Sequence, residues 1–346
     1  MRNQKELHNS KSAPRIKRMR KPSFVVVGGG TGTFTVLSGL KHYPVNLAAV
    51  VAMADDGGST GILRDELGVL PPGDVRQCLV ALSSSDLLMR KLMNYRFSEG
   101  RLRGHSFGNL LLSALEKITG SFNKSVEKAS EILRIQGKVF PATLSKVQLV
   151  ATLQNGKRIV GEHAIGEHSL ARLRKITLEP RARANPQAVQ ALLNADVIVI
   201  GPGDIYSSLI PNFLVRGIRN AICKSKALRV YVCNLMTKRG HTDGFRVHDF
   251  SSLLESYLGC SFDYVIYNTK KPAAQLLQKY AREGECYVAA PPRLPKSKFI
   301  GSALLNTQFP KRTKGDILVR NLIRHNPQRL AHVLFSLARS KKRKVL

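Results

Sequence analysis

Short, continuous apolar runs alternate along this chain with longer segments in which apolar residues recur every three or four positions. The first run is Phe24–Val27, and a periodic segment through Leu37 and Leu40 follows it after a glycine cluster. A second run, Leu47–Met53, comes next. Buried strands that alternate with amphipathic helices are typical of a parallel sheet covered on both faces. The pattern predicts an α/β fold with a doubly wound, mostly parallel sheet.

The same alternation continues to the end of the chain, apart from one segment. Residues 137–180 contain short β-prone runs around Asn155–Gly156, a dipeptide that strongly favours a hairpin turn. We therefore expect a single domain over residues 23–338, with a small β-rich insertion at about 137–180. The remaining helices are expected at about 71–82, 86–97, 110–118, 123–135, 186–193, 276–280 and 327–337, and the remaining strands at 196–200, 230–232 and 264–268.

Composition adds a strong positive charge, formally +32 over 346 residues. Residues 1–21 hold eight Lys and Arg against one acid, and residues 310–346 hold eleven against one. This predicts a disordered basic arm over residues 1–22 and a basic tail over residues 339–346. These segments could bind RNA, anionic lipid or no specific partner. Because about half of the charge lies at the two ends, nucleic-acid binding through the arms is not favoured.

The cysteines and the lengths of the apolar runs indicate the cellular compartment of the protein. Cys78, Cys223, Cys233, Cys260 and Cys286 are scattered and include no Cys-x-x-Cys pair. We expect reduced, mostly buried thiols and no zinc site. No apolar run approaches the ~20 residues needed to span a bilayer. The first 22 residues also lack the apolar region of a secretory signal, so we expect a cytoplasmic protein without a membrane span.

The glycine cluster after the first strand suggests a phosphate-binding loop. Gly28, Gly29, Gly30, Thr31 and Gly32 lie between a predicted strand and a predicted helix. Glycines let a ligand approach the backbone, and the first N–H groups of a helix favour an anion. The dinucleotide fingerprint requires a third glycine where this chain has a threonine, which disfavours a nicotinamide cofactor.

Three other strands end in small polar loops. These loops are Asp55–Gly61, Gly201–Asp204 (which includes Gly203) and Asn234–Thr237. In doubly wound sheets, ligands bind outside the carboxyl ends of the strands, so four such loops predict a shared nucleotide crevice. The alternative for any single loop is that a strand end simply needs turn residues.

Several polar residues in these regions are candidates for chemistry. Asp55 and Asp56 could bind ribose hydroxyls, hold Mg²⁺ or act as a general base, or one could cap the following turn. His105 and Asn109 lie at a helix start, where an anion could bind, although a structural hydrogen bond explains His105 equally well. Arg324 precedes the last helix and could clamp a phosphate or simply be exposed.

Taken together, the motifs resemble those of the gluconeogenesis factor family, bacterial proteins related to 2-phospho-L-lactate transferase. The likeness extends from about residue 24 to about residue 338, and several long motifs occur in the right order. The matching segments are 27–32, 54–61 (Ala-Asp-Asp-Gly-Gly-Ser-Thr-Gly), 70–74 (Leu-Pro-Pro-Gly-Asp), 104–109 (Gly-His-Ser-Phe-Gly-Asn), 201–206 (Gly-Pro-Gly-Asp-Ile-Tyr), 233–237 (Cys-Asn-Leu-Met-Thr) and 323–325 (Ile-Arg-His).

The resemblance implies a Rossmann-like fold and a cytoplasmic protein that binds UDP-sugars, notably UDP-N-acetylglucosamine. It implies ligand contacts from Tyr280, in a Tyr-x-x-Glu-Gly segment, and from Arg324. It also implies a regulatory role in growth on gluconeogenic carbon sources and in cell shape and wall synthesis, with a protein partner in that regulation and scope for a homo-oligomer. No catalytic residue is assigned. The alternative is a transferase that uses Mg²⁺ and a nucleotide-activated donor, with Asp55 or Asp56 holding the metal.

The chain departs from the family pattern in one place that concerns the ligand. A Gln-Pro-Gly-Glu-Thr pattern becomes Lys-Arg-Gly-His-Thr at residues 238–242. His241 replaces an acidic residue, and Lys238 and Arg239 add two cations. This change makes the identity of the bound sugar, more than that of the nucleotide, an open question.

Overall fold

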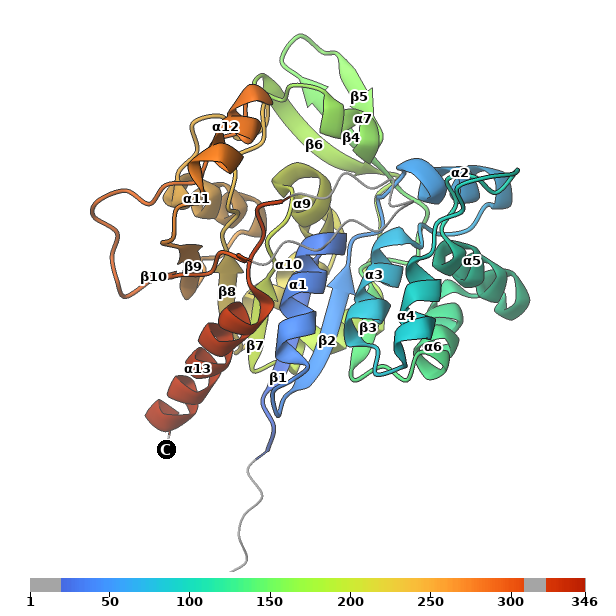
Figure 1. Ribbon diagram of the computed structural model, residues 1–346, viewed down its shortest axis with the longest axis horizontal. Coiled ribbons are helices and arrows are strands. Elements are labelled where there is room, and N and C mark those ends of the chain that lie inside the picture. The colour runs from blue at the N-terminus through green and yellow to red at the C-terminus, as the bar shows by residue number, and fades with distance from the viewer. Residues whose placement is uncertain (1–19, 308–321, 346) are drawn as a thin grey trace, which may run out of the picture.

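The structure is a computed structural model that describes residues 20–307 and 322–345. Its centre is a seven-stranded sheet in which all paired strands are parallel, in the order β10-β9-β8-β7-β1-β2-β3. This confirms the predicted fold class (Figure 1). The strands are β1 Ser23–Gly28, β2 Asn46–Val51, β3 Lys138–Pro141, β7 Val197–Ile200, β8 Leu228–Val232, β9 Tyr264–Asn268 and β10 Phe299–Ser302.

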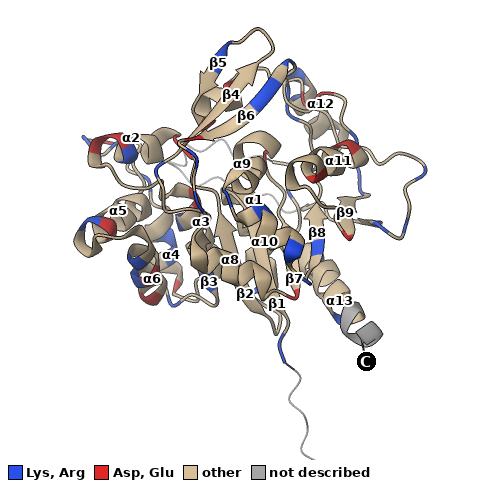
Figure 2. Ribbon diagram, turned by 180° about the vertical axis from the view of Figure 1, so that it is seen from behind, with Lys and Arg blue, Asp and Glu red and all other residues tan. Residues whose placement is uncertain are grey.

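Helices cover both faces of this sheet, as Figures 1 and 2 show from opposite sides. Successive side chains of β1 enter different cores: Phe24 and Val26 face one side, and Val25 and Val27 face the other. This alternation explains why the strand is a continuous apolar run. The first core is closed by α1 Gly30–Leu40, α3 Gly73–Leu82, α5 Phe107–Thr119, α6 Phe122–Ile132 and α13 Pro327–Val345, and the second by α8 Pro186–Leu193, α10 Ile218–Lys224 and α11 Val247–Leu258.

A small antiparallel sheet packs on the second core. It consists of β4 Gln148–Leu153, β5 Arg158–Val160 and β6 Leu173–Glu179, and the turn between β4 and β5 contains Asn155–Gly156, as predicted. The segment 138–141, which we grouped with the insertion, instead forms β3 and pairs with β2 in the main sheet. A four-residue strand carries too little pattern to show which sheet it joins.

Other elements differ from the prediction in extent. The segment 55–61 is not all loop, because α2 Gly58–Leu67 begins within it. The last helix, α13, continues to Val345 instead of ending at residue 337. Strand β10 and helices α10 and α11 were not predicted, and neither were α7 Glu162–Glu167, the π-helix η1 Ile205–Leu209 and α9 Ile210–Leu214. The remaining elements are α4 Leu87–Asn94 and α12 Ala274–Arg282.

The structure corrects the expectation that all cysteines are reduced. Cys223, in the last turn of α10, and Cys260, just after α11, form a disulfide. Cys78 and Cys233 are buried thiols, and Cys286 is exposed. The pairing depends on the end of α10 lying next to the end of α11, where Cys223 also contacts the backbone oxygen of Leu258, and sequence spacing alone does not reveal this.

Helices of the described part include none that is long and apolar enough to cross a membrane. The basic arm expected over residues 1–22 falls outside the described residues except for residues 20–22. Arg20 pairs with Asp196, at a distance of 2.6 Å between nitrogen and oxygen.

Candidate functional site

A cleft of about 370 Å³ opens at the carboxyl edge of the sheet. Strand β1 pairs with β2 on one side and with β7 on the other, so the chain winds away from β1 in both directions. Crevices at such switch points are the usual ligand sites of doubly wound sheets. The predicted site residues that line the cleft are Gly29, Gly30, Thr31, Gly32, Gly203, Asn234, Thr237, Tyr280 and Arg324.

The glycine loop places the start of α1 at this cleft. Gly29 is the N-cap residue, and its lack of a side chain leaves the first N–H groups without a side-chain cap. A Cβ on Gly29 or Gly30 would lie 2.7 or 2.5 Å from the carboxylate oxygens of Asp74. The glycines therefore admit a carboxyl group of the protein itself, as well as a ligand anion, to the positive end of the helix.

Three carboxyl groups beside this loop hold protons at unusually high pH. Burial, together with the charge of Asp55, raises the pKa of Asp74 to about 8. Burial also raises the pKa of Asp55, and it raises the pKa of Glu162 to about 7. Clustered carboxyl groups in a desolvated place favour their neutral forms. Asp74, the member of this cluster that lies on this wall of the cleft, therefore carries less negative charge at neutral pH than an ordinary aspartate.

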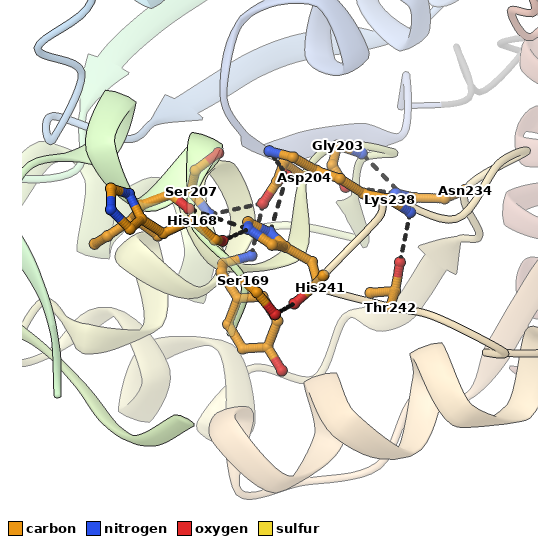
Figure 3. Close-up of polar contacts among 12 residues, drawn as sticks. His168, Ser169, Gly203, Asp204, Ser207, Asn234, Lys238, His241 and Thr242 are labelled. Carbon is orange, nitrogen blue, oxygen red and sulfur yellow. Dashed lines mark hydrogen bonds and ion pairs between the residues drawn. The ribbon is translucent and has the colours of Figure 1, made fainter. Parts of the chain in front are cut away.

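The opposite wall contains a tightly paired carboxylate, Asp204 (Figure 3). Its Oδ1 accepts hydrogen bonds from the backbone N–H groups of Tyr206 and Ser207 at 3.0 and 2.9 Å, which caps η1. Its Oδ2 lies 2.7 Å from Lys238 Nζ and 3.6 Å from His241 Nδ1. Burial alone would raise the pKa of Asp204, but these two neighbours outweigh it and hold the pKa well below the usual value.

His241 connects this wall to the small sheet. The imidazole is buried, and its Nε2 lies 3.0 Å from the backbone oxygens of both Ile165 and His168. Because both partners are carbonyl oxygens, Nε2 carries a proton and donates it. Lys238 and His241, where the chain departs from the family pattern, thus fix the loop after β8 to Asp204 and to α7.

The last part of the cleft comes from α12 and the segment before α13. Tyr280 is buried, and its hydroxyl accepts hydrogen bonds from the backbone N–H groups of Leu322 and Ile323 at 2.8 and 3.3 Å. This holds the segment that carries Arg324. His325 lines the cleft beside it, and burial lowers its pKa to about 4. A neutral imidazole therefore faces the ligand space near neutral pH.

The other predicted residues lie outside the cleft lining. Gly28 ends β1 and Gly201 directly follows β7, and both are buried. His105 and Asn109 are buried at the start of α5, where Ser59 Oγ lies 3.3 Å from His105 Nδ1 and accepts a hydrogen bond from Asn109 at 3.4 Å. Arg76 donates to Asn109 Oδ1 at 2.9 Å. This polar network joins α2, α3 and α5 beneath the site.

The two candidate metal ligands have different surroundings. Asp56 accepts backbone hydrogen bonds from Glu162 and His163 at 3.1 and 2.8 Å and so anchors the start of α7. Asp55 accepts one from Gly57 at 3.0 Å and lies beside Asp74. No group of three or more His, Cys, Asp or Glu side chains within 20–307 and 322–345 is arranged to hold a metal ion. Mg²⁺ often uses one or two carboxylates together with substrate phosphates, and Asp55 with Asp74 fits that pattern.

A larger hollow of about 940 Å³ lies at the amino edge of the sheet, away from these residues. Its walls are the sheet face around Ala48 and Phe140 and the side-chain amides of Gln187 and Gln190 on α8. It includes none of the predicted site residues. We place the candidate site at the smaller cleft because the glycine loop, the helix N-terminus and Arg324 converge there.

Comparison with known proteins decides the family. A family model described as 2-phospho-L-lactate transferase CofD matches residues 24–299. The chain belongs to the CofD family. The gluconeogenesis factor of Bacillus subtilis is 37% identical over 321 residues, which cover 92% of this chain and 98% of that protein. The gluconeogenesis factor of Halalkalibacterium halodurans is 41% identical over 268 residues, covering 77% and 83%.

A solved structure agrees with this assignment. The crystal structure of a UPF0052 family member from Bacillus halodurans has a TM-score of 0.84 at 36% identity and covers 92% of this CofD-family chain and 99% of that one. The resemblance to gluconeogenesis factors drawn from the motifs is therefore confirmed.

Sequence reasoning missed several residues of the cleft in this family member. Asp74 was expected only to open a helix, and Gln77 and Glu285 were not considered. A signal was available for Asp74, because Pro71–Asp74 starts a helix at the same sheet edge as the glycine loop. Gln77 lies one turn further along α3 and follows from the same argument. Glu285 carries no local signal.

Proposed function

We propose that the protein is a UDP-sugar-binding regulator that acts in the cytoplasm and links carbon metabolism to cell shape and cell-wall synthesis. The observation that carries this proposal is the convergence of the α1 N-terminus, Arg324 and Tyr280 on one cleft at the switch point of the sheet. The gluconeogenesis factors among its relatives support the regulatory part.

The ligand's diphosphate would lie against Gly29–Gly32, where the N–H groups of α1 and the guanidinium of Arg324 supply positive charge. The protonated Asp74 carboxyl group would donate a hydrogen bond to a phosphate oxygen instead of repelling it. The Tyr280 ring, whose hydroxyl is bound to the backbone of Leu322, would present its face to the uracil or the sugar. Asn234 and Thr237 would bind ribose or sugar hydroxyl groups.

Isothermal titration calorimetry with UDP-N-acetylglucosamine tests this arrangement. We expect Arg324→Ala to weaken binding at least tenfold, because charge-assisted hydrogen bonds contribute about 1.5–3 kcal/mol. Tyr280→Ala should also weaken it, whereas Arg282→Ala, which removes an exposed cation from the same region, should not. Equal affinities for the wild type and both cleft variants would contradict the proposal.

A second candidate function is a Mg²⁺-dependent transferase that acts on a nucleotide-activated donor. The specific observation in its favour is that Asp55 lies beside Asp74, which lines the cleft. A bound Mg²⁺ would neutralise the phosphates of the donor there. The test is donor consumption across UDP- and GDP-linked compounds with Mg²⁺, compared with Asp55→Asn. Consumption that requires both the metal and Asp55 would establish an enzyme.

The regulatory role can be tested apart from binding. We expect an Arg324→Ala protein, expressed in a host that lacks its own gluconeogenesis factor, to fail to restore growth on gluconeogenic carbon sources, while Arg282→Ala restores it. Affinity capture with and without UDP-N-acetylglucosamine would then reveal a ligand-dependent protein partner or self-association. Full rescue by Arg324→Ala would show that the regulatory role does not depend on the cleft.

A further inference from the structure

The edge of the sheet opposite the cleft forms a second surface of interest. Helix α1 ends there, and Lys41 Nζ donates to the backbone oxygen of Ser83, just after α3, at 3.3 Å. Helix α4 begins a few residues later at Leu87. Tyr43 packs on Phe335 of α13, with 4.9 Å between ring centroids, and α13 then continues past this edge (Figure 1). We call the surface formed by Lys41 and the start of α4 the amino-edge face.

Leucine side chains protrude from this face. Leu87 and Leu88 are 68% and 75% exposed, and Leu92, one helical turn after Leu88, is 37% exposed. The opposite side of α4 is packed normally, since Met93 is fully buried. Burying a fully exposed leucine side chain contributes about 1.5–3 kcal/mol of free energy. Two neighbouring leucines that lie mostly in water therefore favour a partner that covers them.

The surroundings of these leucines are basic. Lys41, Arg90 and Lys91 belong to the same region, and the charge of Arg90 acts on Lys41 directly. Asp86, the N-cap of α4, accepts a hydrogen bond from the Met89 N–H at 2.8 Å. Figure 2 shows the blue of Lys and Arg on α4.

We propose that the amino-edge face docks on the surface of an anionic lipid bilayer, with Leu87 and Leu88 inserted between headgroups. Exposed apolar side chains flanked by cations are the features of interfacial membrane binding. Cations near an anionic bilayer contribute about 1 kcal/mol each. A second copy of this chain, at a formal charge of +32, would be repelled. A bilayer also needs no groove of matching shape, which an acidic protein would have to supply.

The chain contains no tryptophan, so a single introduced tryptophan reports its own surroundings. The test compares Leu88→Trp with Ile118→Trp, a matched control because Ile118 is 80% exposed on α5, away from this face. Each is mixed with vesicles of phosphatidylglycerol and phosphatidylcholine, or of phosphatidylcholine alone. We expect the emission of Leu88→Trp to shift to shorter wavelength on the anionic vesicles only, and that of Ile118→Trp to stay unchanged.

Two further variants separate insertion from attraction by the basic ends of the chain, which all variants keep. Leu88→Glu should weaken vesicle binding at least about tenfold through lost apolar burial. Lys91→Gln should weaken it about fivefold through lost charge. Unchanged Leu88→Trp emission on anionic vesicles, or equal shifts at both positions, would overturn the proposal. So would a Leu88→Trp shift with poly-L-glutamate in place of vesicles, which would assign the face to an acidic protein.

Discussion

Asp204 holds two loops of the cleft in place through its two carboxylate oxygens. One carboxylate oxygen caps η1, and the other faces Lys238 and His241. The cap fixes the loop after β7, and the ion pair fixes the loop after β8. Because both loops line the cleft, the position of Asp204 sets the distance between two of its walls.

We expect Asp204→Asn to lower the free energy of unfolding by about 1–3 kcal/mol, because the Asp204 carboxylate, only 17% exposed, loses its charge-assisted hydrogen bond to Lys238. The lowered pKa of Asp204 means that its contribution is present at neutral pH and is lost as pH falls below the unfolded value of 3.8. Urea unfolding at pH 7 measures the effect. Asp65→Asn, whose carboxylate is 68% exposed, should cost less than about 1 kcal/mol. Equal losses would contradict the role of burial.

Asp74 should give the opposite pH dependence. Its pKa rises from 3.8 to about 8 on folding, so the folded state binds more protons between these values and stability falls as pH rises through that range. Asp74→Asn removes this penalty. We expect the variant to gain melting temperature over the wild type from pH 5 to pH 8, measured with a chelator present. Asp86→Asn is the control, because asparagine also caps α4; parallel curves for Asp74→Asn and the wild type would contradict the prediction.

Among the elements, the first turn of α1 is the most tightly constrained. A Cβ on Gly32 would lie 1.5 Å from the backbone oxygen of Pro202, so the helix start and the loop after β7 touch through their backbones. This contact closes the floor of the cleft. The glycine at this position is therefore required for packing between two loops, in addition to any ligand.

Gly32→Ala should consequently destabilise the protein by at least about 1–3 kcal/mol, the range for overpacked sites, and should weaken nucleotide binding. Gly166→Ala in α7 is the matched control, since its Cβ would meet the nearest atom, Lys238 Nζ, at 3.6 Å. That change should be neutral or stabilising by about 0.5–1 kcal/mol. Thermal unfolding and calorimetry of both variants check the pair; a Gly32→Ala protein as stable as the wild type would disprove the contact.

Elements with strong local patterns were predicted, and elements without them were not. Helix α8 was predicted with its observed bounds, because Asn185 caps it and Pro186 starts it. Strand β10 and helix α11 were missed. Only two of the four residues of β10 are apolar, and α11 starts after a loop in which Arg246 is the cap, a residue that gives no usual cap signal.

The whole molecule assembles its cleft from segments far apart in sequence, which all surround a single space of about 370 Å³. Such a site exists only in the folded state. We therefore expect saturating UDP-N-acetylglucosamine to raise stability by about 2.7 kcal/mol at one hundred times its dissociation constant. Melting curves over a ligand series measure this, and Arg324→Ala should respond less. Stabilisation that is equal in the wild type and in Arg324→Ala would place the ligand elsewhere.

The two proposed surfaces lie at opposite edges of the same sheet. Strands of the main sheet all run from the amino-edge face toward the cleft. A protein docked on a bilayer through Leu87 and Leu88 would thus keep its ligand site open on the far side. This arrangement would let the proposed membrane binding and nucleotide binding occur together, without competition for one surface.

The sequence alone determined the fold class and predicted where the candidate site lies, because both depend on local features. Apolar runs of strand length, helix periods and glycine clusters at strand ends act within a few residues of each other. Tertiary structure alone decided which of those residues meet. His241 bonds to Ile165, 76 residues away, Asp74 approaches the glycine loop, and Cys223 pairs with Cys260. These contacts depend on how whole helices and sheets pack, and no pattern along the chain records that packing.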